Sequence, residues 1–99
     1  MSEPSSPAAG PVTRVIEIVN KKGLHARASA KFVQCVEQFD TEVKVTRGGE
    51  TVGGTSIMGL MMLAAGTGTS ITVQASGRQA AEAMDAIVKL VGSGFGEDD

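Results

Sequence analysis

Several features typical of nucleic-acid-binding proteins are scarce or missing in this chain of 99 residues. It has no Trp or Tyr and only three Phe, and its nine Lys and Arg residues are outnumbered by eleven Asp and Glu residues. Proteins that bind nucleic acids usually carry a basic surface and aromatic side chains on which bases stack. The composition therefore argues against a nucleic-acid partner.

Cysteine and histidine are equally scarce, with a single residue of each, Cys35 and His25. One cysteine cannot form an internal disulfide, and one cysteine with one histidine cannot complete a Cys/His metal cage. No P-loop or dinucleotide-binding glycine motif occurs either. We therefore expect no metal and no cofactor, and we expect Cys35 to pack in the core.

Long hydrophobic runs are missing as well. The longest apolar stretch, residues 57–65, is too short to cross a bilayer. The first residues, Met1 to Pro4, have neither the basic start nor the apolar run of a signal peptide. These features predict a cytoplasmic protein that does not enter the membrane, and we expect it to be a monomer.

The chain is long enough for one small domain, which we place at residues 12–92. Residues 1–11 contain all three prolines together with Ser, Ala and Gly, a composition typical of a disordered tail. The Gly92-Ser93-Gly94 segment is expected to end the last helix, and residues 93–99 are expected to form an acidic C-terminal tail.

Hydrophobic periodicity predicts four strands and three helices between these tails. The strands fall at residues 12–19, 43–46, 51–52 and 71–75, with a Gly48-Gly49 hairpin turn joining the second to the third. The adjacent pair Val15-Ile16 suggests apolar contacts on both faces of the first strand. The order β-α-β-β-α-β-α predicts an α+β fold in which helices cover one face of a sheet and solvent covers the other.

The predicted helices follow Gly23, begin near Ser56 and run from Arg78 to Val91. The first, which ends at Asp40-Thr41, has one apolar face made of Phe32, Val33, Val36 and Phe39. The second has two apolar stripes, one of Leu60, Leu63 and Ala64 and the other of Ile57, Met58, Met61 and Met62. A short helix can bury only one stripe, so the methionine stripe is either core padding or an exposed docking surface.

The segment Gly23-Leu24-His25-Ala26-Arg27 combines a flexible turn, the only histidine and a helix start. Unpaired N–H groups and the helix dipole favour an anion there, and a neutral imidazole is a nucleophile. Arg27 can supply further N–H donors. The pattern suggests that His25 carries a phosphoryl group, although a structural histidine and a surface arginine are the simpler interpretations of each residue alone.

Ser56 is a favourable N-cap for the second helix, which by itself explains a serine at this position. Phosphate on its hydroxyl would be tolerated at a helix N-terminus. It would also place negative charge beside Ile57, Met58 and Met61 and repel an acidic partner.

The two segments Gly23-Leu24-His25-Ala26-Arg27 and Ser56-Ile57-Met58-Gly59-Leu60-Met61 together resemble the histidine-containing phosphocarrier protein (HPr) family of the bacterial phosphotransferase system. The resemblance covers about residues 12–92 and extends to the order of the elements. It implies an open-faced β-sandwich, a four-stranded antiparallel sheet covered by three helices. It also implies a stoichiometric carrier rather than an enzyme, which takes a phosphoryl group from Enzyme I, charged by phosphoenolpyruvate, and passes it to Enzyme IIA-type proteins.

Carried over by position, the resemblance makes His25 the residue phosphorylated at Nδ1 and Arg27 the partner of the phosphate. Ser56 matches the serine modified by HPr kinase/phosphorylase, and the docking patch corresponds to Ile57, Met58 and Met61. One departure is Ala28, where the family usually has proline, a change that loosens the first helical turn without removing a reacting group.

Three alternatives remain at this point. The ending from Ser93 to Asp99 looks like that of the nitrogen-branch paralogue, which regulates through protein binding rather than sugar uptake. A non-catalytic module could use His25 and the helix starts to hold a small anionic metabolite. A purely structural domain could dock through Met58 and Met61 without using His25.

Overall fold

The computed structural model describes residues 10–97, so residues 1–9 of the predicted N-terminal tail and Asp98 and Asp99 lie outside the described residues. The elements follow the predicted order β-α-β-β-α-β-α, with a short 3-10 helix after them. Their bounds are β1 Val12–Glu17, α1 Ala26–Glu37, β2 Glu42–Arg47, β3 Glu50–Gly53, α2 Ile57–Met62, β4 Ser70–Ser76, α3 Ala80–Gly92 and η2 Gly94–Gly96.

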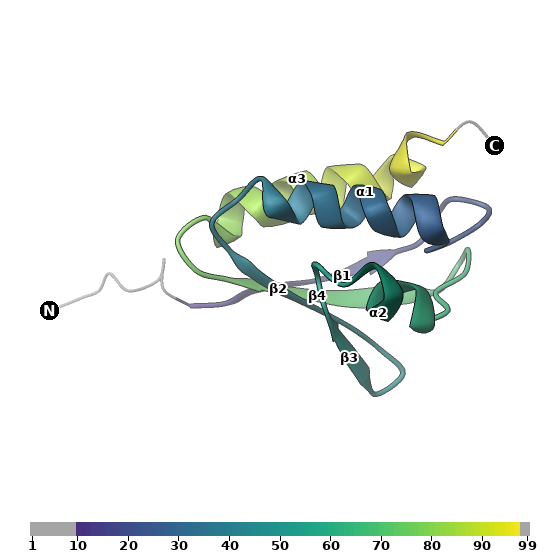
Figure 1. The fold of residues 1–99 in the computed structure, drawn as a ribbon, viewed down its shortest axis with the longest axis horizontal. Coiled ribbons are helices and arrows are strands. Elements are labelled where there is room, and N and C mark those ends of the chain that lie inside the picture. Colours follow the sequence, from purple (N-terminus) through teal and green to yellow (C-terminus); the bar gives the residue numbers. More distant parts are fainter. Residues whose placement is uncertain (1–9, 98–99) are drawn as a thin grey trace, which may run out of the picture.

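The four strands form one antiparallel sheet in the order β1-β4-β2-β3. Helices α1 and α3 lie side by side over one face of it, and α2 packs against α1 (Figure 1). Strand β4 shows that only one face is covered. Its residues Ile71, Val73 and Ala75 are completely buried, while Gln74 between them is exposed. The open-faced sandwich of four antiparallel strands and three helices is confirmed.

The first strand contacts the helices through one face only. Ile16 and Ile18 are buried, whereas Val15 is 70% exposed and Val19 is 50% exposed. The prediction of apolar contacts on both faces is therefore wrong within the described chain. The reason is that successive side chains of a strand alternate between faces and the helices cover a single face of this sheet.

Helix α1 buries most of its predicted apolar face, Phe32, Val33 and Val36. It ends at Glu37, earlier than expected, because the chain turns at Gln38, whose backbone N–H bonds to the carbonyls of the last helical turn. Phe39 consequently lies beyond the helix and is half-buried. Cys35 is half-buried against the core, and this burial raises the pKa of its thiol.

Helix α2 buries only one of its two apolar stripes, as expected of a short helix. Leu60 and Leu63 are buried, and the other stripe is exposed. Ala64, predicted to share a stripe with Leu60 and Leu63, is exposed because the chain leaves the helix there with a φ of 52°. The exposed fractions of the second stripe are 40% for Ile57, 69% for Met58, 38% for Met61 and 69% for Met62.

The C-terminal segment departs most from prediction. Helix α3 starts at Ala80, two residues later than expected. Residues 94–97, predicted to belong to an acidic tail, instead form the 3-10 helix η2 and the residue that follows it. Gly94 and Gly96 adopt positive φ angles, which turn the chain back, and Phe95 between them is only 1% exposed. Burial of this large aromatic side chain makes residues 94–97 part of the packed domain.

We expect Phe95→Ala to lower the free energy of unfolding by about 3 kcal/mol, because it removes a buried aromatic side chain. Urea denaturation is the measurement. Met62→Ala, at a side chain that is 69% exposed, is the control and should change stability by less than about 0.5 kcal/mol. Equal stabilities for Phe95→Ala and the parent would mean that the C-terminal segment does not pack as described.

Candidate functional site

The turn before α1 is built by close backbone contacts that require glycine. Gly23 has a φ of 65°, and a Cβ atom on it would lie 2.3 Å from the carbonyl oxygen of Ala65. That same oxygen accepts a hydrogen bond from the N–H of Leu24 at 3.0 Å. Asn20 closes the turn, since its Nδ2 atom donates to the Gly23 carbonyl at 2.9 Å. The flexible turn predicted at Gly23 is thus present, and the close approach of Ala65 leaves no room for a side chain there.

This turn places His25 at the N-cap of α1, immediately before the first helical residue. Its backbone carbonyl accepts from the Ser29 N–H at 2.8 Å, and its ring Nδ1 accepts from the Arg27 N–H at 3.3 Å. The second distance is beyond the usual range for an N–H donor, so the contact is weak. The side chain is 28% exposed. The ring therefore lies at the electropositive end of the helix with access to solvent, as predicted.

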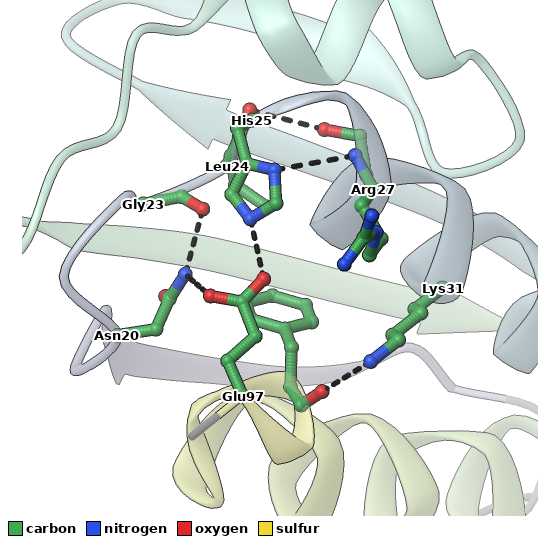
Figure 2. Close-up of polar contacts among 9 residues, drawn as sticks. Asn20, Gly23, Leu24, His25, Arg27, Lys31 and Glu97 are labelled. Carbon is green, nitrogen blue, oxygen red and sulfur yellow. Dashed lines mark hydrogen bonds and ion pairs between the residues drawn. The ribbon is translucent and has the colours of Figure 1, made fainter. Parts of the chain in front are cut away.

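A shallow recess beside the ring is lined by basic residues. Lys22, Arg27 and Lys31 contribute cationic side chains to it, and Gly96 and Glu97 form its C-terminal wall. Figure 2 shows the side chains of Arg27 and Lys31 extending from α1 on the side of His25 and Glu97, with Lys31 reaching the Phe95 carbonyl. The structure thus brings Arg27 and His25 together, as expected of a pair that would share one anion.

Glu97 is a residue of this site that the sequence interpretation missed. Its Oε2 atom contacts His25 Nε2, and its Oε1 atom accepts from Asn20 Nδ2 at 3.0 Å (Figure 2). No histidine–carboxylate pair was expected, because Glu97 is 72 positions from His25 and was assigned to a tail. The available signal was Phe95, a large apolar residue between two glycines in an otherwise small and acidic segment.

The hydrogen bond from Asn20 is the main reason why the pKa of Glu97 lies below the ordinary value for a glutamate. Partial desolvation opposes this effect, while the hydrogen bond and charge of His25 and the charge of Lys31 lower the pKa further. The group is thus ionised at neutral pH.

Ser56 lies apart from this recess, at the N-terminal end of α2. Its Oγ atom accepts from the Gly59 N–H at 3.0 Å, which confirms the N-cap. Ala64 and Ala65, just beyond the opposite end of α2, share a small depression with His25. The C-terminal end of α2 therefore lies near His25 and its N-terminal end carries Ser56. The exposed stripe of Ile57, Met58 and Met61 lies beside Ser56.

Ala28, the departure from the family pattern, is fully buried in the first turn of α1. In a helix the N–H groups of residues 26–28 have no carbonyl one turn earlier to bind. Alanine at this position keeps a backbone N–H that proline would lack.

The arrangement offers a nucleophilic nitrogen, nearby cations and free backbone donors, which suit reversible bonding of a phosphoryl group. Among residues 10–97, no group of three or more His, Cys, Asp or Glu side chains is placed to hold a metal ion. No helix in this part of the chain is long and apolar enough to cross a membrane.

Comparison with known proteins agrees with this geometry. A family model described as "PTS HPr component phosphorylation site" matches residues 12–93. The phosphocarrier protein HPr of Neisseria meningitidis serogroup A is 56% identical over 82 residues, which cover 83% of this chain and 92% of that protein. Phosphocarrier protein NPr of Shewanella violacea is 40% identical over 84 residues, covering 85% of this chain and 92% of the relative.

A solved structure is also similar over most of this chain. The crystal structure of HPr-C-His from Thermoanaerobacter tengcongensis superimposes with a TM-score of 0.84 and 40% sequence identity, over 89% of this chain and 99% of the other. The match in family model, sequence and structure includes both the α1 and the α2 segments. The chain belongs to the HPr family of phosphocarrier proteins of the phosphotransferase system.

Proposed function

We propose that this protein carries a phosphoryl group on His25, accepting it from phospho-Enzyme I and passing it to an Enzyme IIA-type protein. The observation that supports this most directly is the position of the His25 ring at the N-cap of α1, 28% exposed. Its Nδ1 atom faces the N–H groups of the first turn. A phosphoryl group on Nδ1 would therefore meet helix donors and be reachable by a partner protein.

In the proposed reaction the Nδ1 lone pair attacks the phosphorus in line as the phosphorus–nitrogen bond of the donor breaks. The phosphoryl oxygens then replace the ring as partners of the Arg27 N–H, which costs little because that contact is 3.3 Å long. The Arg27 guanidinium, exposed beside the ring, screens the added charge. A carrier must release the group again, and exposed donors hold it less tightly than a buried cage would.

The non-catalytic anion-binding module is less well supported. The basic recess that would receive a small anion already contains the Glu97 carboxylate, which is 12% exposed and bonded to His25 and Asn20. A free anion would have to displace a like charge that the domain itself supplies. Both sugar and nitrogen branches remain compatible with this geometry, since they differ in partners rather than in the chemistry of the ring.

With Enzyme I and phosphoenolpyruvate, His25 should acquire one acid-labile phosphate, and His25→Ala should acquire none. Arg27→Ala is the matched control, because it removes the screening cation but keeps the nucleophile and should be labelled more slowly. Phosphate mass and acid lability are the measurements. Unchanged labelling of His25→Ala, or a phosphate found on serine, would refute the proposal.

Regulation by serine phosphorylation is a second part of the proposal, with an HPr kinase/phosphorylase as the partner that modifies Ser56. Phosphate there would lie at a helix N-terminus, which tolerates negative charge, and beside Ile57, Met58 and Met61, the proposed docking patch. The exposure of this patch, from 38% at Met61 to 69% at Met58, supports its use by Enzyme I.

We expect Ser56→Asp to weaken Enzyme I binding by roughly tenfold or more, because like charges across an interface repel. Stability should change by less than about 0.5 kcal/mol, since aspartate is also a good N-cap. Ser56→Asn, which has the same shape without the charge, is the control. Titration calorimetry with Enzyme I measures the affinities, and equal values for the Asp and Asn variants would contradict this role for charge at Ser56.

A further inference from the structure

The C-terminal segment is anchored where it meets the His25 ring. Phe95 is 1% exposed, and its carbonyl accepts from Lys31 Nζ at 2.7 Å. Asn20 Nδ2 donates to both the Gly23 carbonyl and Glu97 Oε1. Contacts on both sides of the recess therefore hold the Glu97 carboxylate against the ring (Figure 2).

The orientation of the Asn20 amide also indicates that the Glu97 carboxylate is held in place. Its Oδ1 atom is buried without a hydrogen-bond partner in the described part of the chain, which is costly. Rotating the amide would place this oxygen against the Gly23 carbonyl and Glu97, which are both acceptors. The two donor contacts therefore fix the amide, and with it the carboxylate.

The two nitrogens of the ring have different partners. Nδ1 accepts a hydrogen bond from the Arg27 N–H, so in the neutral ring it carries no proton. Nε2 then carries the proton, and its contact is a carboxylate oxygen of Glu97, which can only accept while it is ionised. The surroundings thus select one tautomer, with the lone pair at the mouth of the helix.

We propose that Glu97 is a positioning residue for His25: it holds the Nε2 proton, which keeps the Nδ1 lone pair available and keeps the phosphorylated ring cationic. The inference rests on the proposed phosphocarrier function. When Nδ1 forms the bond to phosphorus, the Nε2 proton stays in place and the ring becomes positively charged. When the group leaves, the bonding electrons return to Nδ1, and the ring is again neutral with its proton on Nε2.

The carboxylate matters because a protonated phosphoimidazole releases its phosphoryl group more readily than a neutral one. An opposite charge in contact with the ring stabilises the protonated form. The other charged groups lining the recess, Lys22, Arg27 and Lys31, are all cations that oppose this effect. Among the residues that line the recess, Glu97 is thus the carboxylate that can retain the proton at neutral pH.

The test compares the parent with Glu97→Gln, which keeps the shape and removes the charge. Glu82→Gln on the exposed side of α3 is the matched control. In the unphosphorylated proteins, ¹⁵N spectra of the His25 ring report the tautomer directly. We expect mainly the Nε2–H form in the parent and in Glu82→Gln, and a larger share of the Nδ1–H form in Glu97→Gln.

The second measurement is the rate of phosphate loss from phospho-His25 against pH, after chemical phosphorylation with phosphoramidate. The rate should fall as the pH rises and the ring loses its proton, and in Glu97→Gln this fall should occur about one pH unit lower. Between the two midpoints the variant should lose phosphate up to roughly tenfold more slowly than the parent. At a pH well below the lowered pKa of Glu97 the two profiles should converge, because the parent carboxylate is then protonated.

Unchanged tautomers together with an unchanged pH profile in Glu97→Gln would overturn the inference. Neither measurement uses Enzyme I. Failure of Enzyme I to phosphorylate the parent would therefore count against the proposed function alone, while the role of Glu97 would still be decided by the spectra and the hydrolysis rates.

Discussion

The N-terminus of α1 is the constraint on which the site depends. A helix start has N–H groups that need partners, and here the side chain that caps it is the imidazole of His25. The cap is held from several directions, by the Gly23 turn against Ala65, by Ser29 Oγ donating to the Leu24 carbonyl at 3.1 Å, and by the buried face of α1 below. These contacts together fix the His25 ring so that Nδ1 faces the backbone N–H groups of the first turn of α1.

A carrier differs from an enzyme in needing a bond that is neither too stable nor too labile, and the contacts of the ring suit that balance. On the Nδ1 side the donors are the backbone and the exposed Arg27, which can exchange with water or with a partner. On the Nε2 side the carboxylate of Glu97 is shielded and fixed by Asn20. In the proposed reaction the exposed Nδ1 side receives the phosphoryl group and the Nε2 side keeps the proton, so transfer does not require the ring to reorient.

Periodicity and turn chemistry were sufficient to predict the order of the elements, the Gly48-Gly49 hairpin and the cap at Ser56, because these depend on neighbours in sequence. The exposure of one stripe of α2 was also foreseeable, since a short helix cannot bury two faces, but the pattern did not decide which stripe. The position of Glu97 was not, because it depends on the buried Phe95 and on contacts with Asn20 and Lys31 that are distant in sequence. The exposure of Val15 likewise reflects which face the helices cover, a property of the assembled sheet.

The most direct test of the account is to identify which nitrogen of His25 bonds to phosphorus. In ¹⁵N-labelled protein phosphorylated by Enzyme I and phosphoenolpyruvate, one-bond coupling between nitrogen and phosphorus marks that atom. The account predicts coupling to Nδ1, the atom that faces the first turn of α1, with the proton retained on Nε2. Coupling to Nε2 would place the phosphoryl group where Glu97 now lies and would contradict the central claim.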